Sequence, residues 1–361
     1  MVLLFYSPGR LCAAAVLLAY SSVQAVQPDV ARGRLKAGSD LLERGETVAA
    51  IRELRSAVAA DPKLAAAHML LGRAYLEQRS VALVAEAKAE LQQALDLDPT
   101  LIWARFYLAK VYIDLGRYDK AREELERGLQ TRADVPHFLS LLGEVNRKLG
   151  KPELAIELNR KALAIDASMT PAHYHIALAL LDLGRNDEAA RQLESAIQSR
   201  YVSTEMYLAL GSLYTGAGRF DEAEELCRKA QALDPSRLEP YVSLAQLYNR
   251  RGAPEKALAA LGRVLESGRS FPTTAYYQKL QADVFLELGR AHLARGAALE
   301  AAKDLEHSLA FEPERGETHR ELAAALFRKG DHAGAREHAA RAEQLGCPVD
   351  AALREQIFAT R

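Results

Sequence analysis

Residues 204–237 read TEMYLALGSLYTGAGRFDEAEELCRKAQALDPSR, and this stretch of 34 residues decides the fold. Leu210 and Tyr214 lie four positions apart, as residues on one face of a helix do. Gly218 follows, and glycine readily adopts the positive φ that a tight helix end requires. A second helical segment runs toward Pro235, which stops it because proline lacks the amide hydrogen that a helix needs. The stretch therefore predicts two antiparallel helices joined by a tight turn.

The same pattern recurs along most of the chain. Its glycine returns at intervals that are mostly 34 residues, at Gly45, Gly116, Gly150, Gly184, Gly218, Gly252, Gly296 and Gly330. Five residues after each of these glycines stands an alanine, and one further copy has the alanine without the glycine. The alanines are Ala50, Ala87, Ala121, Ala155, Ala189, Ala223, Ala257, Ala301 and Ala335. They predict a close approach of two helices at this position, because a larger side chain would clash there.

Leucine, small and tyrosine residues complete the pattern, for example Leu71-Gly72 followed by Tyr75. With these residues the chain resembles the tetratricopeptide repeat family. The resemblance implies an all-α fold: a right-handed superhelical solenoid of nine helix–turn–helix repeats, in which stacking buries the apolar faces. The expected copies are 31–64, 65–101, 102–135, 136–169, 170–203, 204–237, 238–271, 282–315 and 316–348. Residues 349–361 are expected to form a C-terminal capping helix.

The period is broken in two places. One interval between the alanines is 37 residues, which places three extra residues near 79–84, about one helical turn. Another interval is 44 residues, so that an insertion falls around 268–281. The pattern favours a lengthened helix there, and the alternative is a projecting ridge that meets a partner.

Three polar residues are expected to cap helices by accepting a backbone N–H bond. Asp119 and Asp221 follow the turn glycine and would cap the second helix of their copies. Thr273 would cap a long helix that runs to about Arg295.

The first 25 residues differ in composition from the rest. They carry one charge, Arg10, followed by an apolar run over 11–20, and Val23 and Ala25 are small residues where a signal peptidase reads. Residues 1–25 are therefore predicted to be a signal peptide that directs export. An Ala-rich, Arg-rich and Lys-poor composition favours a bacterium, in which the exported chain is expected to be periplasmic. The alternative is an uncleaved N-terminal membrane anchor. No later apolar stretch reaches the 18 residues that a transmembrane helix needs.

Charge and motif content exclude several function classes. Lys and Arg number 47 and Asp and Glu 48, for a net charge of −1, so no basic surface predicts nucleic-acid binding. No His-Glu-x-x-His, Gly-x-Ser-x-Gly or Walker-type sequence occurs. Cys227 falls at a core position, where a thiol is inert. We therefore expect no catalytic, cofactor-binding or metal-binding residues, and no enzymatic activity.

In the family that the chain resembles, the first helices of the copies line a concave groove in which peptides commonly bind. The candidate partner-binding residues at matching positions are Trp103, Phe106, Tyr107, Lys110, His137 and Tyr174. Exposed aromatic side chains beside a cation are typical of binding hot spots. The alternative is that neighbouring copies bury these rings. Mixed charges at matching positions of the later copies, such as Glu287 and Arg290, are typical of a solvated face.

These observations predict a non-catalytic scaffold of the bacterial cell envelope that binds protein or peptide partners in its groove. The alternative is an accessory subunit of a secretion, pilus or polysaccharide synthesis or export machine. The sequence does not favour one partner over another.

Overall fold

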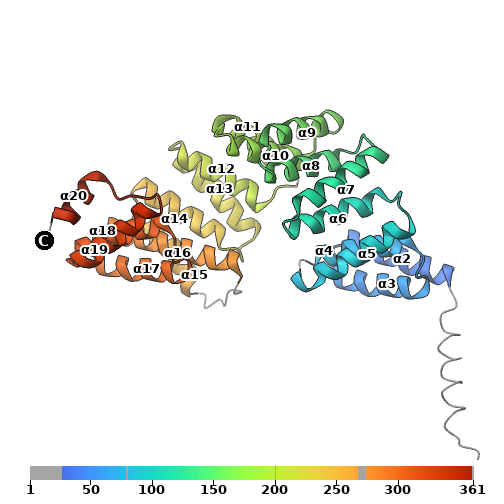
Figure 1. Cartoon of the computed structure of the whole chain (residues 1–361), viewed down its shortest axis with the longest axis horizontal. Coiled ribbons are helices and arrows are strands. Elements are labelled where there is room, and N and C mark those ends of the chain that lie inside the picture. The colour runs from blue at the N-terminus through green and yellow to red at the C-terminus, as the bar shows by residue number, and fades with distance from the viewer. Residues whose placement is uncertain (1–26, 79, 200, 267–273, 360–361) are drawn as a thin grey trace, which may run out of the picture. The chain divides into compact units, whose positions relative to one another are not determined.

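The computed structural model describes residues 27–78, 80–199, 201–266 and 274–359, and within them it is all helical (Figure 1). The predicted signal peptide, 1–25, lies outside the described residues. The described residues contain nineteen α-helices, one short 3-10 helix and no strand, which confirms the predicted fold class. None of the described helices combines the length and apolar character needed to cross a membrane.

The chain divides into two compact units, of which the first ends at Gly184 and the second begins at Arg185. Unit 1 contains α2 (Pro28–Glu43), α3 (Thr47–Ala60), α4 (Ala65–Glu77), η1 (Val81–Leu83), α5 (Val84–Leu97), α6 (Ile102–Asp114), α7 (Tyr118–Thr131), α8 (Pro136–Lys148), α9 (Pro152–Ile165) and α10 (Thr170–Asp182). Unit 2 contains α11 (Asn186–Ile197), α12 (Thr204–Gly216), α13 (Phe220–Leu233), α14 (Glu239–Arg251), α15 (Pro254–Glu266), α16 (Ala275–Ala294), α17 (Ala298–Phe311), α18 (Gly316–Lys329), α19 (His332–Gln344) and α20 (Ala351–Ala359).

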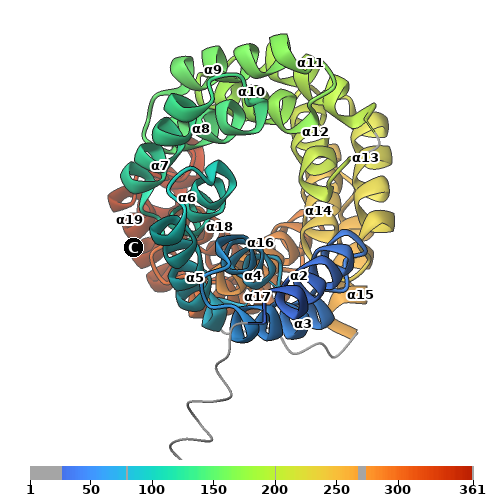
Figure 2. The ribbon, with the colours of Figure 1, turned by 90° about the vertical axis from the view of Figure 1, so that its right-hand side faces the viewer.

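Every even-numbered helix from α2 to α18 is the first helix of a copy, and the next α-helix is the second. The boundary between the units falls inside the copy formed by α10 and α11. In unit 1, α6, α8 and α10 line one side of the row, and α7 and α9 lie on the other side (Figure 2). In unit 2, α12 and α14 likewise lie on the side opposite α13. We call the side formed by the first helices of a unit its first-helix face.

Small residues lie where the two helices of a copy cross. All nine of the repeated alanines have no exposed surface, and the residue opposite each of them on the first helix is a buried glycine or alanine. At Gly289 on α16, an added Cβ would lie 2.5 Å from Cγ of Leu305 on α17, so a side chain there would force Leu305 to shift. The predicted close approach of the helices is therefore confirmed, and it leaves room for the leucine beneath it.

The turns follow the prediction, whereas the caps differ from it. Gly218 has a φ of +77°, and the other turn glycines share this left-handed conformation. Asp119 and Asp221 do not cap their helices, because they lie inside the first helical turn, after Arg117 and Arg219 at the cap positions. There their charges still face the positive end of the helix dipole.

Both departures from the period are helical. The extra residues near 79–84 include the 3-10 turn η1, directly before α5. The part of the insertion that the structure describes belongs to α16, which has 20 residues. Its cap is Thr274 rather than Thr273, since Thr274 has an extended backbone and its side chain accepts the N–H of Tyr277. Thr273 itself lies outside the described residues.

A buried histidine ties copy two to the turn before it. In His68, Nε2 donates to the carbonyl of Pro62 at 3.0 Å, and Nδ1 lies 2.6 Å from the carboxylate of Glu90. The hydrogen bond to Glu90 raises the pKa of His68 above its ordinary value of 6.5. Protonation of His68 therefore strengthens this copy.

The last copy repeats the arrangement with a second histidine in place of the acid. His319 donates from Nε2 to the carbonyl of Pro313 at 2.9 Å, and its Nδ1 lies 2.8 Å from Nδ1 of His338. Burial and then the neighbouring His319 lower the pKa of His338 below its ordinary value of 6.5. The pair accommodates one proton between the two Nδ1 atoms, whereas a second proton there would bring two donors into opposition.

We predict that the two histidines change stability with pH in opposite directions. The contribution of His338 is fully present above pH 6.5 and is lost as pH falls through its lowered folded pKa, whereas that of His68 is present below pH 6.5 and is lost as pH rises through its raised pKa. The urea midpoint above pH 6.5 minus the midpoint below it should be smaller in His338→Gln than in the wild type, and larger in His68→Gln. The same pH difference in all three proteins would contradict the prediction.

Candidate functional site

Four of the six candidate residues form one aromatic cluster on the first-helix face of unit 1. Trp103 on α6 makes edge-to-face contacts with Phe106 at 5.4 Å between ring centroids and with His137 on α8 at 5.8 Å. Tyr107 lies 5.6 Å from Phe106. Trp103 is 37% exposed and His137 is exposed, whereas Phe106 and Tyr107 are half-buried. The cluster is thus anchored in the protein and open at Trp103 and His137.

A fifth ring, which the sequence did not single out, forms the base of this cluster. Phe138 on α8 has no exposed surface and lies 5.3 Å from Phe106 and 5.9 Å from Trp103. It fits against Gly128 of α7, where an added Cβ would lie 2.1 Å from the Phe138 ring. We call Trp103, Phe106, Tyr107, His137 and Phe138 the aromatic cluster.

Cationic side chains flank the cluster. Lys110 is exposed and lies on the face of α6 that carries Phe106 and Tyr107, since it follows them by four and three residues. Arg73, on the neighbouring α4, lies 6.0 Å from the centre of the Tyr107 ring and bonds Glu77 at 2.7 Å. Burial raises the pKa of Tyr107, so its phenol stays neutral. Within the described part of the chain Lys110 has no ion pair, and it lies on α6 one turn from Phe106 and Tyr107.

Tyr174, the sixth candidate residue, lies on α10. It is half-buried, and its ring lies 6.1 Å from that of His175. The described contacts do not join it to Trp103 or Phe106, so its part in binding stays a prediction.

Next to Tyr174, the structure brings together a serine, a histidine and an acid. Ser140 Oγ lies 2.9 Å from His175 Nδ1, and Glu144 lies 3.5 Å from His175 Nε2. These are the groups of a hydrolase triad. However, Ser140 is 1% exposed between α8 and α10, so a substrate carbonyl cannot reach its oxygen. The arrangement connects two helices and gives no support to catalysis.

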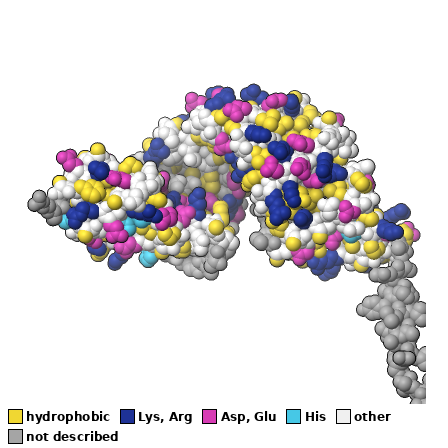
Figure 3. Space-filling model, viewed as in Figure 1, with side chains coloured by type: hydrophobic (Ala, Val, Ile, Leu, Met, Phe, Trp, Pro, Cys, Tyr) yellow, Lys and Arg dark blue, Asp and Glu magenta, His cyan; other side chains and the backbone are white. Residues whose placement is uncertain are grey.

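Other reactive groups are equally enclosed or scattered. Burial raises the pKa of the Cys227 thiol to about 12, which keeps it protonated and unreactive. Across the described ranges, no three His, Cys, Asp or Glu side chains are grouped to hold a metal ion. On the face shown in Figure 3, positive and negative side chains alternate without a field of one sign.

Comparison with known proteins agrees with this architecture. Three family models, each described as tetratricopeptide repeat, match residues 84–145 and 214–284, residues 35–102 and 174–237, and residues 316–341. Together these ranges span most of the chain. A curated relative, the human Protein O-mannosyl-transferase TMTC1, is 25% identical over 207 residues, which are 57% of this chain and 23% of the relative. The chain thus spans about a quarter of that protein.

Two solved structures share the fold. The Cut9-Hcn1 hetero-tetramer of the APC/C aligns over 86% of this chain and 58% of its own, with a TM-score of 0.63 and 16% identity. The type IV pilus biogenesis factor PilW aligns over 56% of this chain and 93% of its own, with a TM-score of 0.50 and 18% identity. At these identities the likeness concerns the fold alone. From the repeated helix pairs and the family matches, we conclude that the chain belongs to the tetratricopeptide repeat family.

Proposed function

We propose that the protein is a non-catalytic scaffold that binds a segment of a partner protein on the first-helix face of unit 1. Tetratricopeptide arrays are in general scaffolds of this kind. The observation that carries the proposal is the aromatic cluster, in which Trp103 lies exposed on a base formed by the fully buried Phe138. The proposed binding surface consists of Trp103, Phe106, Tyr107, Lys110 and His137. Tyr174 would extend this surface onto α10.

The cluster has the physical properties of a binding hot spot. Its rings hold one another in edge-to-face contacts, so little side-chain entropy remains to be lost when a partner binds. An apolar side chain that packs on Trp103 would remove apolar surface from water, which is worth roughly 25 cal/mol per Å². Lys110 would then attract a carboxylate beside that side chain. The preferred segment therefore carries a large apolar residue next to an acidic one.

We further propose that the protein acts in the bacterial cell envelope. The support for this is the sequence of residues 1–25, where one positive charge precedes a short apolar run and a small-residue exit at Ala25. An array exported in this way would gather envelope proteins. The protein could gather these envelope proteins as an accessory subunit of a secretion, pilus or polysaccharide synthesis or export machine.

We predict that replacing Trp103 and Phe106 with alanine abolishes partner capture, and that Trp103→Ala alone weakens capture while barely changing the thermal midpoint or the helical content. Trp103 is partly exposed, so its loss removes contact surface rather than core. The measurement is affinity capture from the native envelope, with mass spectrometry of the bound proteins and circular dichroism of the variant.

Phe358→Ala is the control, because it removes another exposed ring, from α20 in unit 2. It should leave capture unchanged. Trp103→Ala alone keeps the test valid if the double variant unfolds, since Phe106 also contacts the buried Phe138. Undiminished capture by Trp103→Ala, or a loss of several kcal/mol of stability in that variant, would refute the proposed surface.

We predict that the mature protein begins at Val26, because cleavage is expected after Ala25. N-terminal sequencing of protein from a periplasmic extract is the measurement. Full-length chain in the membrane pellet would indicate the uncleaved anchor instead. Full-length chain in the cytosol would refute export.

A further inference from the structure

A polar cavity of 620 Å³ lies on the first-helix face of unit 2. Its lining comes from α12, α14, α16 and α18, with Cys227 of α13 behind them. Most of its side chains are polar or charged and none is aromatic, in contrast to the aromatic cluster of unit 1. The sequence had suggested a solvated face here, but Glu287 at the floor of the cavity is only 2% exposed. This part of the face is therefore not fully solvated, because it holds a buried carboxylate.

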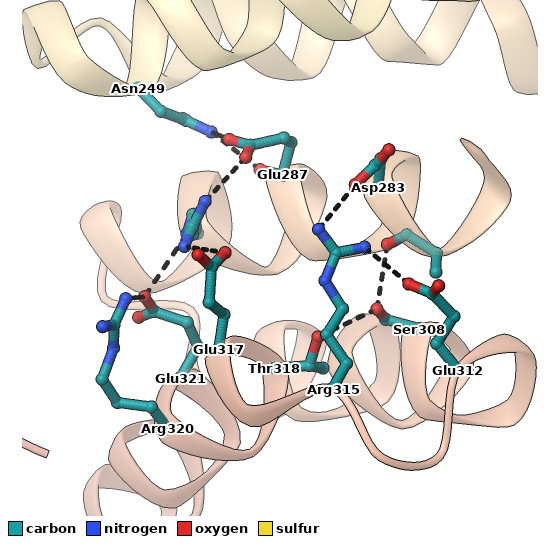
Figure 4. Close-up of polar contacts among 12 residues, drawn as sticks. Asn249, Asp283, Glu287, Ser308, Glu312, Arg315, Glu317, Thr318, Arg320 and Glu321 are labelled. Carbon is teal, nitrogen blue, oxygen red and sulfur yellow. Dashed lines mark hydrogen bonds and ion pairs between the residues drawn. The ribbon is translucent and has the colours of Figure 1, made fainter. Parts of the chain in front are cut away.

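One guanidinium at the floor is held by three carboxylates. Arg290 donates from Nη1 to Glu287 at 2.8 Å, from Nη2 to Glu317 at 3.3 Å and from Nε to Glu321 at 3.3 Å. Asn249 reaches Glu287 from α14, donating from Nδ2 to both its carboxylate, at 2.8 Å, and its backbone carbonyl, at 2.9 Å (Figure 4). Three first helices are joined through this contact network, and every nitrogen of Arg290 is engaged.

Three acceptor atoms of this contact network have no hydrogen-bond partner within the described part of the chain. Oδ1 of Asn249 is buried and has no hydrogen-bond partner. Glu317 receives hydrogen bonds only at Oε2 and Glu321 only at Oε1, within the described part of the chain, so that Glu317 Oε1 and Glu321 Oε2 are open. Only the Asn249 oxygen among these three is buried, and a buried acceptor without a donor is costly. The two carboxylate oxygens carry charge and belong to side chains that reach solvent. A ligand that fits must supply N–H donors, and a positive charge makes these bonds stronger.

We propose that this cavity binds the basic side chain of an arginine or lysine in a partner segment, on the open carboxylate oxygens of Glu317 and Glu321 and beside the buried amide of Asn249. The proposal rests on the proposed function, because it takes the first-helix faces to bind protein segments. An acidic side chain fits less well. It would meet three carboxylates, and among the described guanidiniums at the cavity only Arg250 is without an ion pair.

The test uses the full chain with selective ¹⁵N labelling of asparagine. The chain has four asparagines, so the side-chain amide of Asn249 gives one resolvable pair of signals, assigned by its loss in Asn249→Ser. The probes are the capped peptide acetyl-Gly-Ser-Arg-Ser-Gly-amide and its analogue with Glu in place of Arg, at equal ionic strength. The arginine peptide should shift the Asn249 signal saturably, and the glutamate peptide should not.

Variants of the two open carboxylates separate this site from general charge attraction. The double variant Glu317→Gln and Glu321→Gln should bind the arginine peptide about tenfold more weakly, the loss expected for one charge-assisted hydrogen bond. Glu300→Gln, an exposed position on α17, should bind as the wild type does. Glu317→Gln alone, at a half-exposed side chain, keeps the test valid if the double variant loses helical content.

Three outcomes would overturn the proposal: an Asn249 shift with the glutamate peptide instead, no shift with either peptide at millimolar concentration, or undiminished binding in a folded carboxylate variant. This test is independent of the proposed binding surface of unit 1, because Trp103→Ala should bind the arginine peptide as the wild type does. If capture does not depend on Trp103 while the peptide still binds, the cavity stands and the proposed surface of unit 1 falls.

Discussion

The close crossing of two helices at small side chains is the constraint on which the rest of the structure depends. In every copy an alanine without exposed surface faces a buried glycine or alanine, and a buried side chain, most often leucine, lies one turn further on. At Gly289 the space for a Cβ is already taken by Leu305. Because this contact is the same in each copy, the helix pairs stack alike, and the positions that face outward are free to vary.

The residues at the helix crossings therefore set the fold, and the outward-facing residues form the proposed binding surfaces. The first-helix face of unit 1 carries rings that contact one another, with Lys110 beside them, whereas that of unit 2 carries an enclosed network of charges around Arg290. An apolar anchor suits the first surface and a basic side chain suits the second. A partner that carries both an apolar anchor and a basic side chain could bind each unit through a different kind of interaction.

The fold could be predicted from the sequence because its determinants are local: glycine and alanine spacing sets the helix pairs and the turns. Contacts between copies could not be predicted in this way. Phe138 supports Trp103 only because Gly128, in the preceding copy, leaves room for its ring. Likewise the charges of Glu287 and Arg290 are typical of a solvated face, yet Glu287 is buried, and it bonds Asn249 of the preceding copy. The cap at Thr274 was missed by one residue, since side-chain chemistry alone does not distinguish two adjacent threonines.

The close crossing of the helices is tested most directly by a double-mutant cycle at Gly289 and Leu305, in which the midpoint of urea unfolding is measured. In the wild type, Gly289→Ala should destabilise, because the new Cβ meets Leu305 at 2.5 Å. In the Leu305→Ala background the same change should stabilise, since the clash is gone and alanine favours a helix over glycine by about 1 kcal/mol. A coupling of about 0.5–3 kcal/mol is expected for residues in contact. An effect of the same sign and size in both backgrounds would contradict the close crossing as the organising contact.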